Sequence, residues 1–72
     1  MKLTINGELK SLRTTDSSPT LIEIVKLLGH NPKIIVIELN GAIINPKEWS
    51  KQIIQADDIL EIVTIVGGGD SP

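Results

Sequence analysis

The sequence predicts an α+β domain in which one helix packs across a mixed sheet of four or five strands. Two Asn-Gly pairs, Asn6-Gly7 and Asn40-Gly41, follow extended apolar segments, as in tight hairpins. Residues 21–28 have the apolar spacing of an amphipathic helix, and residues 59–66 have the composition of a strand. With 72 residues, the chain has room for one such domain and not for two.

The N-terminal segment predicts a hairpin. Polar and apolar residues alternate from Lys2 to Asn6, which places Leu3 and Ile5 on one side of a strand. After the Asn6-Gly7 turn, a second strand is expected at Glu8 to Leu12, followed by a polar loop over residues 14–19.

The main helix has clear start and stop signals. Thr20 and Glu23 have the spacing of a capping box, and Gly29 stands where a glycine can end the helix in the left-handed conformation. The expected apolar stripe consists of Leu21, Ile24, Val25 and Leu28.

The second half of the chain predicts short strands and turns. We expect strands at Ile34–Leu39, Ala42–Ile44 and Ile59–Val66, a brief edge strand at Ile53 and Ile54, one helical turn at Pro46–Ser50, and a turn at Gln55–Asp58.

This order of elements predicts a β-grasp (ubiquitin-like) fold, with the first and last strands parallel and adjacent in the middle of the sheet. A ferredoxin-like fold would need a second full helix, for which the chain has no room. The expected domain spans residues 1–66, and residues 67–72 are expected to form a flexible C-terminal glycine tail.

Composition excludes several classes of function. The formal net charge is −2, and Trp49 is the only Phe, Tyr or Trp residue, which argues against a nucleic-acid-binding surface. The longest apolar run, Ile34 to Ile37, is far too short to span a membrane, and the N-terminus lacks the pattern of a signal peptide. Without cysteine, a disulfide or a cysteine-ligated metal site is impossible. We therefore expect a cytoplasmic protein that binds neither metal nor membrane.

Four segments together resemble the ThiS family of sulfur carriers. They cover the chain from about Ile34 to Gly69, whereas the N-terminal half fits by pattern alone. The segments are Asn40-Gly41, Asn45-Pro46-Lys47-Glu48-Trp49, Ala56-Asp57-Asp58 and the run from Glu61 through Val66 to Gly67-Gly68-Gly69.

The resemblance implies that the chain is not an enzyme. In this family an E1-like adenylyltransferase (ThiF-like) uses ATP to adenylate the terminal glycine carboxylate, which then becomes a thiocarboxylate. A thiazole synthase (ThiG-like) accepts the sulfur for thiamin biosynthesis. The residues that correspond to the reactive end are Gly69 and Gly68, with Gly67 in the tail, and the chain itself binds no cofactor.

Two other functions stay open. The molybdopterin-synthase small subunits (MoaD-like) share the fold and the diglycine end, but usually carry a Pro-Pro pair where this chain has Thr64-Ile65-Val66. A non-catalytic ubiquitin-like interaction module would need no free glycine terminus.

The chain departs from the family pattern after Gly69, where Asp70-Ser71-Pro72 follows. An activated carboxylate must be terminal. Either these residues are removed, or they remain from expression, or this chain is not itself the active carrier.

A glycine tail suits this chemistry, because glycine has a small cross-section and three extended residues reach roughly 10 Å. Since the chain lacks cysteine, a carried sulfur would have to be on the C-terminal acyl group. The chain also has no phosphate-binding glycine loop, so the nucleotide site would belong to the partner. The alternative interpretation of Gly67 to Gly69 is a flexible linker.

The last strand also predicts a partner-binding patch. Its alternation places Leu60, Ile62 and Val66 on one face and Glu61 on the other, which marks the second face as open. Ile59, Val63 and Ile65 share that face, and we expect them to form an exposed apolar docking site.

Three other candidates are interpreted as structural. His30 follows the helix end and has no second ligand or nucleophile to pair with. Asp57 and Asp58 lack the spaced ligands of a calcium loop, which favours a turn. Trp49 is expected to anchor a short turn against the core rather than to bind a partner.

Overall fold

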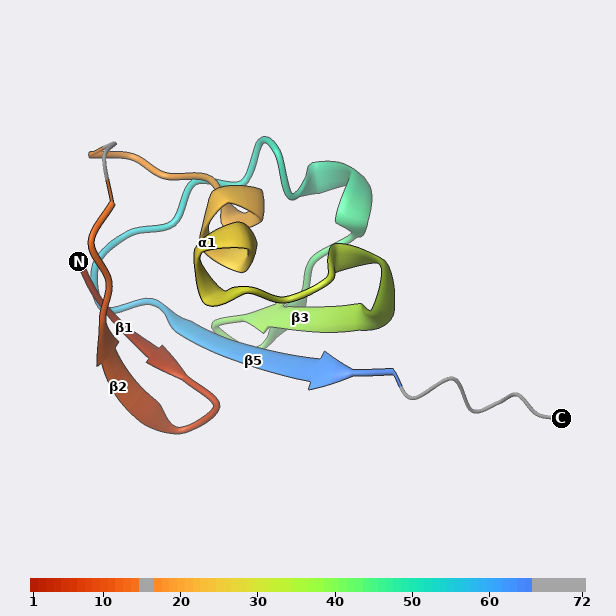
Figure 1. Ribbon diagram of the computed structural model, residues 1–72, viewed down its shortest axis with the longest axis horizontal. Coiled ribbons are helices and arrows are strands. Elements are labelled where there is room, and N and C mark those ends of the chain that lie inside the picture. The colour runs from red at the N-terminus through yellow and green to blue at the C-terminus, as the bar shows by residue number, and fades with distance from the viewer. Residues whose placement is uncertain (15–16, 66–72) are drawn as a thin grey trace, which may run out of the picture.

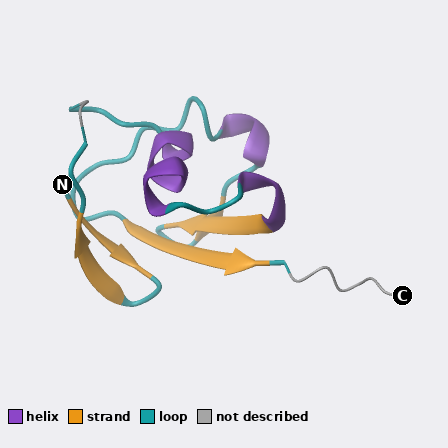
Figure 2. Ribbon diagram, in the orientation of Figure 1, coloured by secondary structure: helices purple, strands orange, loops and turns teal. Residues whose placement is uncertain are grey.

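The computed structural model describes residues 1–14 and 17–65 and has the predicted architecture, one helix across a five-stranded sheet (Figures 1 and 2). The elements are β1 (Lys2–Ile5), β2 (Glu8–Ser11), α1 (Leu21–Leu28), a 3-10 turn (Pro32–Ile34), β3 (Ile35–Leu39), β4 (Ala42–Ile43), a second 3-10 turn (Pro46–Glu48) and β5 (Ile59–Thr64).

The strand order is β2-β1-β5-β3-β4. As predicted, β1 and β5 are parallel neighbours in the interior of the sheet, and the pairs β1–β2, β3–β4 and β3–β5 are antiparallel. The last strand along the chain therefore lies at the centre of the sheet, between β1 and β3.

Both Asn-Gly pairs form the predicted tight turns. Asn6 and Gly7 have φ angles of 52° and 83°, and Asn40 and Gly41 have φ angles of 51° and 90°. Two consecutive positive φ angles define the type I′ turn, whose twist matches that of the strands it joins.

The side chains of the two turn asparagines bind β5 from opposite sides. Asn6 acts as an extra peptide group: the Ile62 N–H donates to its Oδ1 (2.7 Å), and its Nδ2 donates to the Ile62 carbonyl oxygen (3.1 Å). On the other side, the Ile59 N–H donates to Asn40 Oδ1 (2.9 Å), and Asn40 Nδ2 donates to the Asp58 carboxylate (3.1 Å). Each hairpin thus holds the central strand through its turn residue.

The helix α1 has the predicted ends. The Glu23 N–H donates to Thr20 Oγ1 (3.4 Å), and the Thr20 N–H donates to Glu23 Oε1 (2.8 Å), which completes the capping box. Gly29 ends the helix with a φ of 80°. Of the predicted stripe, Leu21, Ile24 and Val25 are fully buried, and Leu28 is half-buried against the core.

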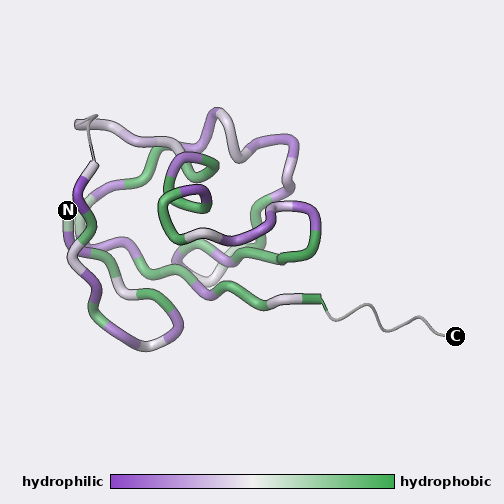
Figure 3. Tube along the Cα trace, in the orientation of Figure 1, coloured by the Kyte–Doolittle hydropathy of each residue, from purple (hydrophilic) through white to green (hydrophobic). Residues whose placement is uncertain are grey.

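The core lies between α1 and one face of the sheet. Figure 3 shows hydrophobic residues along α1, β3 and β5, and a hydrophilic turn between β1 and β2. The core residues are Leu3, Ile5, Leu21, Ile24, Val25, Ile35, Ile37, Trp49, Ile54, Leu60 and Ile62. As interpreted from the sequence, Trp49 is structural: it is 2% exposed, and its Nε1 donates to the Ile44 carbonyl oxygen (3.0 Å).

The prediction of an edge strand at Ile53 and Ile54 is wrong. Ile53 makes only an isolated bridge to Thr20, and the Ile54 N–H donates to the Pro19 carbonyl oxygen (2.8 Å). The segment pairs with the entry to α1 instead of the sheet because burial of Ile54, which is 1% exposed, requires it to approach the helix.

Several predicted boundaries also shift. The second strand ends at Ser11 and not at Leu12, and Ile34, predicted as the first residue of a strand, belongs to a 3-10 turn. The strand β5 ends at Thr64, and Val66 lies outside the described residues, as do the predicted domain boundary at residue 66 and the tail at residues 67–72. In residues 1–14 and 17–65, no helix is long and apolar enough to cross a membrane.

We predict that Asn6→Gly destabilises the domain by about 1 to 2 kcal/mol, because glycine keeps the positive φ but removes both hydrogen bonds to Ile62. Urea unfolding of wild type and variant measures the difference. Asn6→Asp, which has nearly the same shape but lacks the donor, should also be less stable. Equal stability of wild type and Asn6→Gly would show that the hydrogen bonds from the Asn6 side chain to Ile62 do not stabilise the domain.

Candidate functional site

The three candidate tail residues, Gly67, Gly68 and Gly69, lie outside the described residues. The structure does define the strand that leads to them. Ile65 is still attached to the sheet, because its N–H donates to the Ile34 carbonyl oxygen (2.6 Å). Gly67 is only two residues further along the chain.

The candidate docking residues are exposed, as the alternation of β5 predicts. The exposed fractions are 48% for Ile59, 61% for Val63 and 54% for Ile65, whereas Leu60 and Ile62 point into the core at 0% and 6%. In the part of the chain that the structure describes, the helix packs on the opposite side of the sheet, so this open face is uncovered (Figure 1). The part of these residues in binding stays a prediction.

Strand register extends the open face beyond β5. Val36 lies directly opposite Val63, and Ile43 lies opposite Glu38, so these residues share the face of Val63 and Ile65. Ile43 is 68% exposed. The name open face is used below for Val36, Ile43, Ile59, Val63 and Ile65, together with Glu38 and Glu61. Val36 and Ile43 could not be predicted from the sequence because the strand register was not known.

Two carboxylates stand within this apolar surface. Glu38 and Glu61 are direct antiparallel partners on β3 and β5. Lys10 and Glu8 on β2 form an ion pair (3.8 Å). Within residues 1–14 and 17–65, neither Glu38 nor Glu61 has a basic side chain within 4.0 Å. The open face is therefore apolar with an acidic centre.

The other titratable candidates form no catalytic arrangement. Among the residues that the structure describes, no group of three or more His, Cys, Asp or Glu side chains could hold a metal. His30 is half-buried, and its backbone N–H donates to the Val25 carbonyl oxygen at the helix end (3.2 Å). Asp58 accepts from the Gln55 N–H (2.8 Å) within a turn, and Asp57 has a φ of 71°, as the turn interpretation expected.

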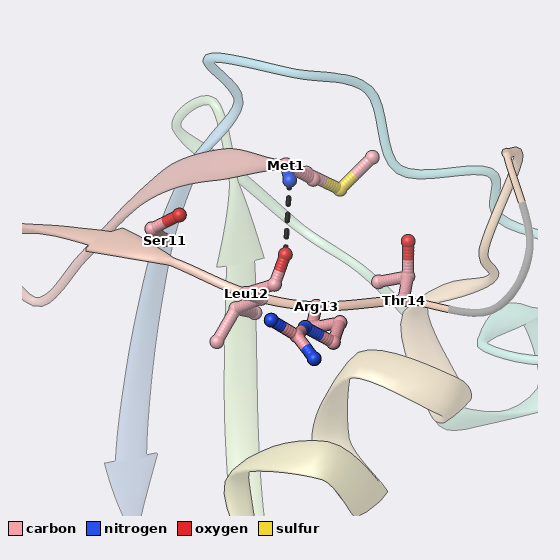
Figure 4. Close-up of a pocket in the computed structure, with 5 residues that line it drawn as sticks. All are labelled: Met1, Ser11, Leu12, Arg13 and Thr14. Carbon is pink, nitrogen blue, oxygen red and sulfur yellow. Dashed lines mark hydrogen bonds between the residues drawn. The ribbon is translucent and has the colours of Figure 1, made fainter.

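An open polar hollow of about 430 Å³ lies beside the start of β1, lined by Met1, Ser11, Leu12, Arg13 and Thr14 (Figure 4). Within it the Met1 ammonium donates to the Leu12 carbonyl oxygen (2.9 Å). The start of β1, where the hollow lies, is at the opposite end of the sheet from the C-terminal end of β5 (Figure 1).

The model of the ThiS family matches residues 3–69, a range that includes all of the described residues except Met1 and Lys2 and extends through Gly67 to Gly69. The protein ycf40 of Trieres chinensis is 40% identical over 55 residues, which cover 76% of this chain and 75% of that protein. A thiazole synthase of Magnetococcus marinus is 31% identical over 72 residues, which cover all of this chain but only 21% of that protein.

Solved structures share the fold. The crystal structure of the thiamine biosynthesis protein (ThiS) from Geobacter metallireducens superimposes with a TM-score of 0.80 at 24% identity, covering 96% of this chain and 100% of that one. The NMR structure of a thiamine biosynthesis protein from the same organism gives a TM-score of 0.79 at 23% identity, with 100% and 92% covered. These likenesses confirm the predicted β-grasp fold.

Proposed function

The chain belongs to the ThiS family, and we propose that it is a sulfur carrier whose C-terminal glycine acyl group transports sulfur for thiazole synthesis. The observation that carries this proposal is that the family match extends through Gly69, and that the glycines follow in the sequence after a central strand with an uncovered apolar face. The chain is the carrier, and its partners perform the catalysis.

The chemistry requires a free glycine carboxylate. An adenylating enzyme of the E1-like (ThiF-like) class joins the carboxylate of Gly69 or Gly68 to the AMP part of ATP, with release of pyrophosphate. Sulfide, supplied by a donor, then displaces AMP at the acyl carbon, which leaves a thiocarboxylate. No cysteine is present in the chain, so the acyl end is the position available for the sulfur.

The relationship to a thiazole synthase supports that enzyme as the sulfur acceptor. In the protein of Magnetococcus marinus, a segment that matches this whole chain occupies 21% of a longer polypeptide named thiazole synthase. Covalent attachment holds two partners at high effective concentration. We therefore propose a thiazole synthase (ThiG-like) as the separate acceptor for this chain.

The open face is proposed as the docking surface for the adenylating enzyme. It includes the exposed side chains of Ile59 and Val63 on β5 and of Ile65 just after it, in the part of the chain that leads to the glycines. Exposed apolar surface of this kind marks protein interaction sites. Docking there would place the partner beside the start of the reactive segment.

We predict that a form of the chain ending at Gly69 gains about 16 Da, the difference between sulfur and oxygen, on incubation with the ThiF-like enzyme, ATP and a sulfur source. The form that retains Asp70-Ser71-Pro72 should gain this mass only after those residues are removed, because its glycine carboxyl is in a peptide bond. Intact-mass spectrometry measures both, and omission of ATP is the control. An unchanged mass for the Gly69-ending form, with an enzyme active on its own carrier, would contradict the proposal.

We also predict that Val63→Asp or Ile65→Asp raises the Kd for the adenylating enzyme by about 30-fold or more, since a charge would be buried in an apolar contact. Titration calorimetry measures the Kd, and circular dichroism checks the fold. The matched control is Leu27→Asp, a similarly exposed apolar residue (52%) on α1 and not on the open face. Equal loss of binding in all three variants, or in none, would argue against docking through the open face.

A further inference from the structure

The acidic centre of the open face is formed by two carboxylates that oppose each other directly. Glu38 and Glu61 are register partners across β3 and β5. In an antiparallel pair, the Cβ atoms of such partners are about 4.5 to 5.5 Å apart, and like charges in this position destabilise the sheet. The arrangement therefore has a cost in the free domain that the fold does not require.

The surroundings of the two carboxylates are apolar. The next pair of partners along the same two strands is Val36 with Val63, and Ile43 lies opposite Glu38 on β4. No ion pair within 4.0 Å involves either glutamate in residues 1–14 and 17–65. Apolar side chains of Val36, Val63 and Ile43 thus adjoin the pair, and among the described residues no basic side chain is within ion-pair distance of it.

Two carboxylates among apolar side chains restrict the kind of partner that can bind the open face. A purely apolar partner would strip water from two carboxylates without replacing it, which is strongly unfavourable. A second copy of this chain, packed face to face about a two-fold axis, would bring two further carboxylates to the same place. A partner that carries a cation at this point instead removes the repulsion and gains charge-assisted hydrogen bonds.

We propose that the open face receives an apolar partner surface from which one arginine inserts between Glu38 and Glu61. Arginine fits better than lysine because its planar guanidinium presents five donors, enough to bind two carboxylates at once. The inference rests on the proposed function, in which the partner is the adenylating enzyme. In this complex the valines and isoleucines supply buried area, and the glutamate pair supplies recognition of the correct partner.

The test uses Glu38→Gln, Glu61→Gln and the double variant, each of which keeps the side-chain shape and removes the charge. The probe is the ThiF-like adenylating enzyme, and titration calorimetry gives the Kd at low and high salt. We expect each single variant to raise the Kd about tenfold or more, and the double variant to lose most of the salt dependence. The free variants should melt at the wild-type temperature or a few degrees above it, since repulsion is relieved.

The matched control is Glu48→Gln, an exposed glutamate in the second 3-10 turn, which removes the same formal charge away from the open face. It should bind like wild type. If Glu48→Gln raises the Kd as much as Glu38→Gln and Glu61→Gln do, the effect arises from the net charge of the chain, and the arginine proposal is overturned.

The remaining outcomes separate this inference from the function itself. If both glutamine variants bind like wild type while Val63→Asp does not bind, docking through the open face stands and the arginine proposal is lost. If Val63→Asp also binds normally, the docking surface itself is wrong. A free chain that dimerises in sedimentation velocity, more tightly after Glu38→Gln and Glu61→Gln, would assign the face to a second copy and overturn the proposal.

Discussion

The structure depends on the pairing of β5 on both of its edges. Parallel β1 and antiparallel β3 fix this strand, and the side chains of Asn6 and Asn40 add hydrogen bonds at Ile62 and Ile59. A strand held in this way cannot slip by one residue, because a slip would exchange its buried and exposed side chains. The fixed register therefore keeps the side chains of Leu60 and Ile62 in the core.

The same constraint creates the surface assigned to function. Once alternate residues of β5 are buried beneath α1, the residues between them must face outward. Their register partners on β3 then bring Val36 beside Val63 and Glu38 beside Glu61. From Ile65 to Gly69 the chain has four further residues, which can extend no more than roughly 14 Å. A partner that docks on this face would therefore have to carry its acyl-activating site close to the end of β5.

The sequence predicted the features whose causes are local. The Asn6-Gly7 and Asn40-Gly41 pairs each specify a type I′ turn. Thr20, Glu23 and Gly29 specify the two ends of the helix. Neighbouring residues along the chain were therefore sufficient to predict these features. The segment at Ile53 and Ile54 was misassigned because its pairing depends on where α1 lies. The side-chain bonds of Asn6 to Ile62 join residues 56 positions apart, which no local pattern reveals. For the candidate site, the exposure of Val63 and Ile65 followed from alternation, but the contribution of Val36, Ile43 and Glu38 required the strand register.

Methyl NMR of the Ile-, Leu- and Val-labelled chain during titration with the adenylating enzyme tests whether the open sheet face presents the glycine segment to its partner. If it does, the methyl signals of Val36, Val63 and Ile65 will shift or broaden on binding, while those of Leu27 on the exposed side of α1 will stay unchanged. Perturbation of Leu27 with unchanged signals for Val36, Val63 and Ile65 would contradict docking through the open face.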